Sequence, residues 1–298
     1  TAPAVLIVNP NASRVTPEVV AAVERELGYV DTVLTERPGH AAELAERACG
    51  TASRIYVLSG DGGFNEVVNG LDGIVPVGFL PGGGTSVVPR ALGLPRDPVE
   101  AARELSFSER VRRIALGVAN GRRFLFSAGL GLDAELVRAV DTLGRRTDGR
   151  RPGDAAFARE LLRILAARRG RFRPALTVLE HGRAAFVLVA NGDPYSYVGR
   201  VPLHVAPEAR FELGLDLVAP RDVRARDLIR LAWWTLIRPR RDGGRGLIAV
   251  HDADGVEIEC DVPTPLQADG EDLGDVSFVR FEAERDALSV LVSARDSA

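Results

Sequence analysis

Short apolar runs alternate with amphipathic stretches through the first hundred residues. Uninterrupted apolar runs predict buried strands, which we place at Ala4–Val8, Tyr29–Leu34, Arg54–Ser59 and Val75–Leu80. Helices are expected in the stretches between them, at residues 17–27, 41–49 and 64–71. The first of these is marked by the N-cap pair Thr16-Pro17 and by Gly28 after its last turn. The alternation predicts a parallel sheet covered by helices.

The pattern changes near Val111, where β-rich runs become adjacent. Residues 111–119 and 122–127 flank Asn120-Gly121, a strong signal for a two-residue hairpin turn. A second hairpin is expected between residues 175–179 and 184–190, around Glu180-His181-Gly182. These runs predict an antiparallel domain with helical insertions at Asp154–Ala167 and Asp227–Ile237.

The fold class expected is therefore α/β plus β, in two domains. The last two predicted strands, residues 276–282 and 287–292, either extend the β-rich domain or return to the first sheet, and we favour the return. The domains are then an α/β domain at 1–112, rejoined by 283–298, and a β-rich domain at 113–282.

The amino-acid composition excludes several catalytic mechanisms. The sequence contains no lysine, so all 38 basic residues are arginine, and mechanisms that need a P-loop, protein-kinase or Schiff-base lysine are excluded. Cys49 and Cys260 form no C-x-x-C pair, which disfavours a zinc knuckle or a disulfide framework and fits a reducing, cytoplasmic compartment. No secretory leader or apolar run of roughly 18 residues is visible, although trimming stays open, so we expect a soluble or peripheral protein.

A glycine-rich loop follows the third predicted strand. Ser59-Gly60-Asp61-Gly62-Gly63 leads from that strand into the predicted helix, an arrangement that presents main-chain N–H groups to a phosphate. Asp61 would repel bound phosphates unless a divalent cation lay between them, so it is interpreted as a Mg²⁺ or nucleotide-hydroxyl contact. The alternative is a tight turn in which Asp61 only caps the helix. Asn65 stands where the dinucleotide fingerprint has its third glycine, which disfavours dinucleotide binding.

A second loop, Pro81-Gly82-Gly83-Gly84-Thr85-Ser86, follows the fourth predicted strand and precedes a short helical stretch. Because the carboxyl ends of parallel strands lie at one edge of a sheet, both loops are expected at one crevice, where a triphosphate would span them. Thr85 and Ser86 add hydroxyl donors, although either one alone is as well explained as a helix cap.

Five motifs in this order resemble the diacylglycerol kinase catalytic family, which includes bacterial lipid kinases and sphingosine kinases. They are residues 9–13, the block 59–71, Gly78-x-x-Pro81 with Gly84-Thr85, residues 91–95, and Asp269-Gly270-Glu271. The resemblance implies a Rossmann-like nucleotide domain, a C-terminal β-sandwich that forms a lipid pocket, and transfer of the γ-phosphate of ATP to a lipid hydroxyl with Mg²⁺.

The same resemblance implies roles for individual residues. Glu271 would accept the proton of the acceptor hydroxyl, and Asp61 would organise nucleotide and metal. Without the family, a solvated hairpin turn is the favoured interpretation of Glu271. The residues expected to contact nucleotide are Asn9, Pro10, Asn11, Ala12, Ser13, Thr35, Ser59, Gly60, Asp61, Gly62, Gly63, Asn65, Gly84 and Thr85.

Three motifs depart from the family pattern. Gly63 stands where threonine is common, and Ser86-Val87 stands where an Asn-Asp pair is common, so polar contacts to phosphate are fewer. Leu213 occupies the place of a metal-binding aspartate, which puts the structural Mg²⁺ site in doubt and leaves Glu212 or Asp216 as substitutes.

Charge is unevenly distributed in a chain whose formal net charge is only −3. Residues 144–173 carry +7 and residues 221–245 carry +5, which indicates a surface that faces anions. Trp233-Trp234 lies in the second basic stretch and favours an anionic membrane over nucleic acid, although a packed helix with solvated arginines explains it equally well. We therefore expect a lipid substrate, peripheral binding at the inner membrane face and no nucleic-acid partner. Strand edges in the β-rich domain are compatible with a homodimer.

The leading hypothesis is an ATP- and Mg²⁺-dependent lipid kinase. One alternative is a kinase of a non-lipid alcohol, such as the related NAD kinases, which share a Gly-Asp-Gly loop. A second is a non-catalytic nucleotide- or lipid-binding relative, suggested by Gly63, Val87 and Leu213, although Asp61 and Glu271 are retained.

Overall fold

Two compact units make up the chain. The structure, a computed structural model, describes residues 3–144, 152, 154–224, 227 and 246–294. One unit comprises Thr1–Leu116 with Arg285–Ala298, and the other comprises Gly117–Glu284. Sequence patterns placed the two boundaries after residues 112 and 282, within four residues of this division.

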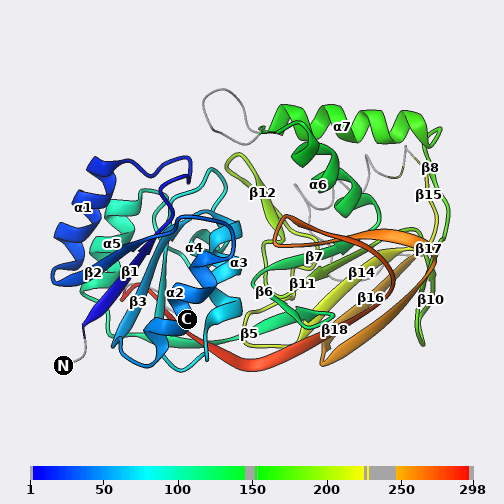
Figure 1. Cartoon of the computed structure of the whole chain (residues 1–298). Helices are drawn as coiled ribbons and strands as arrows, with labels where there is room; N and C mark the ends of the chain where they lie inside the picture. The colour runs from blue at the N-terminus through cyan, green and yellow to red at the C-terminus, as the bar shows by residue number, and fades with distance from the viewer. Residues whose placement is uncertain (1–2, 145–151, 153, 225–226, 228–245, 295–298) are drawn as a thin grey trace. The chain divides into compact units, whose positions relative to one another are not determined.

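The first unit is built on a parallel sheet with the order β2-β1-β3-β4. Its strands are β1 (Ala4–Val8), β2 (Val30–Leu34), β3 (Arg54–Ser59) and β4 (Val77–Pro81). Its helices are α1 (Pro17–Leu27), α2 (His40–Cys49), α3 (Asp61–Gly70), α4 (Val87–Ala91) and α5 (Pro98–Ser106). Figure 1 shows α1 and α5 on one face of the sheet and α2 and α3 on the other. The predicted α/β fold is confirmed.

Local sequence explains where these helices begin and end. The Thr16 hydroxyl accepts from the Val19 N–H at the start of α1, and Gly28 ends that helix with a φ of +78°. Asp97 caps α5 by accepting from two backbone N–H groups, and Pro98 begins the helix, although the sequence analysis predicted no helix here. Buried apolar residues from both α1 and α5 pack against β1, β3 and β4 and form the core on that face.

Strand β18 (Glu271–Leu291) crosses from the second unit of the chain to the first. The sequence predicted two strands here, whereas a single strand runs through residues 283–286. The predicted break corresponds to a local irregularity in that strand, at Asp286, whose φ is +51°. Its last part pairs in parallel with β4, at Val290 and Val77. Strand β5 (Val111–Ala119) also begins in the first unit and ends in the second, and it pairs with β18.

The second unit is dominated by an antiparallel sheet with the order β16-β14-β11-β7-β17-β18. These strands are β7 (Ser127–Leu130), β11 (Val187–Ala190), β14 (Leu215–Pro220), β16 (Leu247–Ala253) and β17 (Gly255–Ala268). Short strands complete the unit: β6 (Arg122–Phe124), β8 (Arg171–Phe172), β9 (Leu176–Val178), β10 (Gly182–Ala184), β12 (Ser196–Val198), β13 (Val201–Leu203) and β15 (Val223–Arg224). A strand-rich C-terminal part was expected.

Both predicted hairpins are present. Asn120 and Gly121 have φ values of +48° and +87°, the left-handed pair that a tight β5–β6 turn requires. The second hairpin joins β9 and β10, but the run 184–190 is not one strand. It divides into β10 and β11, because β11 leaves the hairpin to pair with β7 and β14.

The described residues of the second unit include two helices with defined bounds. They are α6 (Leu132–Thr142), which the sequence analysis missed, and α7 (Asp154–Ala167), whose predicted bounds are confirmed. Both lie over one face of the sheet (Figure 1), and apolar residues of α6 and α7 pack together around Phe172 and Phe186. The predicted helix 227–237, with Trp233 and Trp234, lies outside the described residues apart from Asp227.

Among the described residues, no helix combines the length and apolar character needed to cross a membrane.

Candidate functional site

The two glycine loops of the first unit meet at the carboxyl ends of β3 and β4. The Gly82 N–H donates to the Ser59 carbonyl oxygen at 2.7 Å. A Cβ atom added to Gly83 would stand 2.7 Å from the Gly60 Cα, which is closer than real Cβ contacts allow. Glycine is therefore required at position 83, because only the bare backbone lets the loops approach this closely.

Helix α3 begins directly after the first loop. Gly60 is its N-cap and provides no side-chain cap, and the Phe64 N–H makes a 3.1 Å bond to the Gly60 carbonyl. The N–H groups of Asp61, Gly62 and Gly63 precede that bond and lie at the positive end of the helix. This arrangement is suited to binding the oxygens of an anion.

Asp61 lies at the junction of the two loops. Its Oδ1 accepts from the Val87 N–H at 2.7 Å, so a side chain of α3 caps the short helix α4. Asp61 therefore does not cap the helix that follows its own loop, α3, as the alternative expected, but caps α4. A cation or nucleotide contact by Asp61 stays a prediction.

Several predicted nucleotide contacts lie near this edge of the sheet. Asn9 follows β1 and donates its N–H to the Leu58 carbonyl at 3.0 Å, while its Oδ1 accepts from the Asn11 N–H at 2.9 Å. The loop then returns to the second glycine loop through a 2.9 Å bond from the Arg14 N–H to the Gly82 carbonyl. Residues 9–13 and both glycine loops therefore lie around one edge of the sheet.

The remaining predicted contacts differ in exposure. Thr35 follows β2 and donates its N–H to the Val8 carbonyl at 2.8 Å, and Gly84 and Thr85 are exposed. Asn65 is fully buried in α3, where its carbonyl accepts from the Asn69 side chain at 2.8 Å. The burial of Asn65 shows a structural use for it, and its contact with nucleotide stays a prediction.

In the second unit, Glu271 follows a tight turn. Asp269 and Gly270 have φ values of +49° and +78°, and Ala268 pairs with Glu271 across the β17–β18 hairpin. The hairpin interpretation is thus correct as a local description. The Arg122 Nη2 donates to Glu271 Oε2 at 2.7 Å, and the Glu271 side chain is 32% exposed. The carboxylate is oriented by Arg122 and remains accessible to solvent.

Asp269 anchors that turn from within. It is buried, and its carboxylate accepts from the N–H groups of Leu125, Phe126 and Ser127 at 2.7, 3.0 and 3.3 Å. The sequence analysis used Asp269 only as part of a motif. A buried carboxylate that accepts several backbone bonds fixes the start of β18 relative to the segment before β7.

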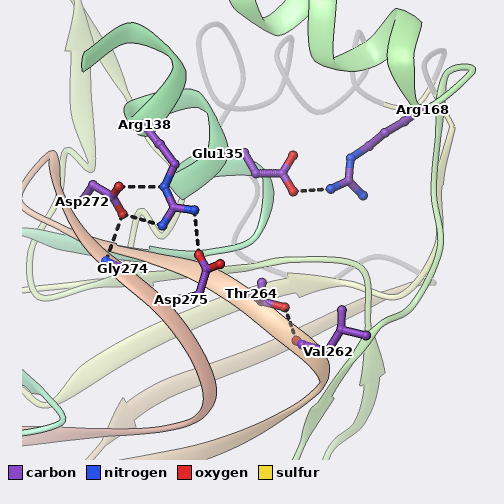
Figure 2. A network of polar contacts seen from close by, with 8 residues as sticks. All are labelled: Glu135, Arg138, Arg168, Val262, Thr264, Asp272, Gly274 and Asp275. Carbon is purple, nitrogen blue, oxygen red and sulfur yellow. Dashed lines mark hydrogen bonds and ion pairs between the residues drawn. The ribbon is translucent and has the colours of Figure 1, made fainter. Parts of the chain in front are cut away.

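Arg138 of α6 holds the segment immediately after Glu271 (Figure 2). Its Nε and Nη2 donate to the two oxygens of Asp272 at 2.7 and 2.9 Å, and its Nη1 donates to Asp275 at 2.6 Å. The Gly274 N–H also donates to Asp272, at 3.0 Å. The Arg138 guanidinium lowers the pKa of Asp272 below its usual value. We call Arg138, Asp272 and Asp275 the arginine clamp, and the sequence analysis missed it.

A buried polar network also contacts the turn at Asp269-Gly270. Tyr195 and Gln267 donate to Asp133 Oδ2 at 2.7 and 2.6 Å, and Gln267 Oε1 accepts from the Gly270 N–H at 2.9 Å. Burial raises the pKa of Asp133, and burial beside that carboxyl raises the pKa of Tyr195. Glycine at position 129 leaves room for this carboxylate, because a Cβ there would stand 2.3 Å from Asp133 Oδ2. The sequence analysis missed this network.

The structural Mg²⁺ site, for which Glu212 or Asp216 was the expected ligand, does not fit the contacts of Asp216. Both of its carboxylate oxygens lie 2.9 Å from His251 Nδ1, and one accepts from the Asp252 N–H at 3.0 Å. Asp216 raises the pKa of His251, which favours an imidazolium where a metal ion would be needed. Among the described residues, no cluster of three or more His, Cys, Asp or Glu could hold a metal ion. Metal binding by Glu212 or Asp216 stays a prediction that these contacts disfavour.

Sequence comparisons agree on the first unit. The profile of the diacylglycerol kinase catalytic domain matches residues 3–119. Diacylglycerol kinases of Bacillus subtilis and Staphylococcus haemolyticus are 37% and 32% identical over 120 and 135 residues, or 39% and 42% of this chain. The matched stretch spans only about two fifths of those relatives, at 40% and 41% of their length.

Structural comparisons extend over the whole chain but show the fold alone. A crystal structure of a diacylglycerol kinase from Bacillus anthracis superposes with a TM-score of 0.68 at 19% identity, covering 98% of this chain and 97% of that one. An NAD kinase from Archaeoglobus fulgidus in complex with ATP gives a TM-score of 0.51 at 15% identity, covering 98% and 94%. Residues 3–119 therefore match the diacylglycerol kinase catalytic domain in sequence, and over the whole chain the likeness to these kinases is one of fold.

Proposed function

We propose that the protein is an ATP- and Mg²⁺-dependent lipid kinase that transfers the γ-phosphate to a hydroxyl of a diacylglycerol-like lipid. The observation that carries the proposal is the convergence of two glycine loops beside the start of α3, within the matched residues 3–119. Main-chain N–H groups can bind phosphate without the help of a lysine, and this chain contains no lysine. The ATP complex of the NAD kinase supports nucleotide use by this fold.

The chain's own residues have distinct tasks in this proposal. The loops at Gly60–Gly63 and Gly82–Thr85 bind and orient the phosphates, and Asp61 provides an oxygen ligand beside them. Bound Mg²⁺ would neutralise charge on the transferring phosphoryl group. Glu271 accepts the proton of the lipid hydroxyl at one of its carboxylate oxygens, with Arg122 orienting the group.

A transfer assay with matched variants tests the proposal. Purified protein is incubated with labelled ATP, Mg²⁺ and vesicles that contain diacylglycerol, for wild type, Glu271→Gln and Glu284→Gln. Glu284 is the control because it too lies on the continuation of β18 and pairs with an arginine, Arg123 Nε at 2.7 Å. We expect transfer in wild type and Glu284→Gln and a loss of about 100-fold in Glu271→Gln. Full activity in Glu271→Gln would remove Glu271 as the proton acceptor.

The same assay separates the alternatives. Sphingosine and NAD replace diacylglycerol in parallel reactions, because the NAD kinase shares this fold. Phosphorylation of NAD alone would favour the non-lipid kinase. ATP binding without transfer to any acceptor would favour the non-catalytic relative.

We further propose that the protein binds anionic membranes peripherally at the inner face. Helix α7 supports this: Leu162 is 66% exposed, and the neighbouring Arg159 and Arg163 side chains are 66% and 72% exposed around the single acid Glu160. Sedimentation with phosphatidylglycerol vesicles should recover the protein, less so at high salt or with Leu162→Glu. Phe107→Glu is the matched control, since Phe107 is 82% exposed in the first unit. Equal recovery on neutral vesicles would contradict the proposal.

A further inference from the structure

Ser59 is a buried serine whose hydroxyl has no partner. It ends β3, its residue is 2% exposed, and its Oγ makes no hydrogen bond within the described residues. Burying a hydroxyl without a partner is unfavourable, and such groups in native proteins call for an explanation.

The Ser59 hydroxyl points into the first turn of α3. An ideal Cβ at Gly63 would stand 2.1 Å from Ser59 Oγ and 2.9 Å from Ser59 Cβ, so the hydroxyl occupies the place that a side chain at position 63 would take. The Asn9 Nδ2 lies 3.8 Å from the same point. The glycine at position 63 therefore does more than remove a polar contact to phosphate. Its lack of a side chain makes room for the Ser59 hydroxyl.

The surroundings of this hydroxyl define what it would bind. The N–H groups of Gly62 and Gly63 precede the first α3 bond, from the Phe64 N–H to the Gly60 carbonyl, and no side chain caps this end. Donors and the helix dipole favour an anion, and a hydroxyl adds one more donor to its oxygens. Across the sheet edge, Ser86 offers a contrast, because its Oγ both accepts from the Gly83 N–H and donates to the Gly83 carbonyl at 3.2 Å.

We propose that the Ser59 hydroxyl is a phosphate-binding donor of the nucleotide site and that Gly63 is its obligatory partner, so that the hydroxyl can be moved to position 63 only if Ser59 is removed. This inference rests on the proposed binding of ATP, and it assigns a hydroxyl donor in place of the threonine that is common at position 63 in the family pattern.

Calorimetric titration with ATP and Mg²⁺, and separately with adenosine, tests the first part. We expect Ser59→Ala to weaken ATP binding about tenfold, because hydrogen bonds to charged groups exceed neutral ones in strength, and to leave adenosine binding unchanged. Equal ATP affinity in wild type and Ser59→Ala would overturn the inference. Since no lipid is present, that outcome is distinct from a failure of lipid phosphorylation, whereas a wild type that binds no ATP would overturn the inference and the proposed function together.

Thermal unfolding without nucleotide separates a ligand role from a structural one. Ser59→Ala removes an unpaired buried hydroxyl and should leave the Tm unchanged or raised, whereas Ser86→Ala breaks two hydrogen bonds and should lower it. A lower Tm for Ser59→Ala would show that the hydroxyl is satisfied within the protein and would contradict the assignment.

A double-mutant cycle tests the pairing. Gly63→Ser alone places a Cβ against Ser59 Oγ and should weaken ATP binding and stability, and Ser59→Gly alone removes the donor. Ser59→Gly/Gly63→Ser exchanges the two positions and should restore ATP binding to within about threefold of wild type. Affinity losses that add in the double variant would overturn the pairing.

Discussion

The glycine loops of the first unit and the turn that carries Glu271 in the second unit are built by opposite means. The glycine loops of the first unit depend on the absence of side chains, because Gly60 and Gly83 approach each other through bare backbone. The turn that carries Glu271 depends on side chains: Asp269 beneath it, and Arg138 clamping the segment after it. The glycine loops are therefore expected to be sensitive to added atoms, and the Glu271 turn to lost ones.

This difference has a physical origin. Main-chain N–H groups can bind phosphate oxygens only where no side chain covers them. A loop with this task is therefore built from glycines, which leave the N–H groups accessible. A proton acceptor needs one carboxylate at a defined place, and a hairpin end is fixed only by contacts made to it. The predictions below test the contrast by adding atoms to one part and removing them from the other.

The largest effect is expected from Asp269→Ala. The change leaves the N–H groups of Leu125, Phe126 and Ser127 without their buried acceptor, and the free energy of unfolding should fall by about 3 kcal/mol. Urea denaturation measures it. Asp269→Asn keeps one oxygen acceptor and should lose less. A loss below about 0.5 kcal/mol in Asp269→Ala would contradict the view that side-chain contacts hold this turn.

Gly83→Ala tests the loops by addition. Its Cβ would stand 2.7 Å from the Gly60 Cα, backbone that cannot move aside cheaply, so we expect a loss of about 2 kcal/mol in stability and weaker ATP binding. Gly84→Ala is the matched control for stability, because nothing lies within 4 Å of its Cβ position. Equal denaturation midpoints for the two alanine variants would remove the close-approach argument.

Arg138→Ala removes the arginine clamp. We expect about 1 kcal/mol of lost stability, and faster hydrogen exchange in residues 270–275, because three donor contacts to Asp272 and Asp275 disappear. Arg183→Ala breaks an exposed pair with Asp261 and should cost less.

The clamp also predicts a dependence on pH. Because the folded pKa of Asp272 lies below 3.8, its pairing stabilises the protein above that pH, and the contribution is lost as the pH falls through the folded pKa. The stability difference between wild type and Arg138→Ala should therefore shrink in acid. A difference that stays constant down to pH 2 would argue that Arg138 acts by packing alone.

The smallest effect concerns His251, away from both parts. Asp216, with Glu208 and Asp252, raises its pKa above 6.5, so the ion pair stabilises the fold below that value and is lost as pH rises through the folded pKa. In an NMR titration, Asp216→Asn should lower the pKa of His251 towards 6.5. An unchanged pKa would return Asp216 to consideration as a metal ligand.

Sequence patterns predicted the first unit more fully than the second. Local signals, such as the Thr16 cap and the apolar runs of β1 and β3, can be recognised directly in the sequence. The two glycine loops are likewise recognisable from their glycine content. The side-chain contacts that hold the Glu271 turn could not be predicted from local sequence. Arg138 and Asp272 are 134 residues apart, and only the folded sheet brings them together. Likewise, Ser59 was expected to bind nucleotide, but its dependence on Gly63 appears only from their spacing in the structure.

The central claim is that main-chain donors of the first glycine loop, and not arginine side chains, hold the phosphates. A crystal structure of the protein grown with a non-hydrolysable ATP analogue and Mg²⁺ tests it most directly. The account predicts phosphate oxygens within hydrogen-bonding distance, about 3 Å, of the N–H groups of residues 61–63. Phosphates bound elsewhere, with the Gly60–Gly63 loop making no contact to the nucleotide, would contradict it.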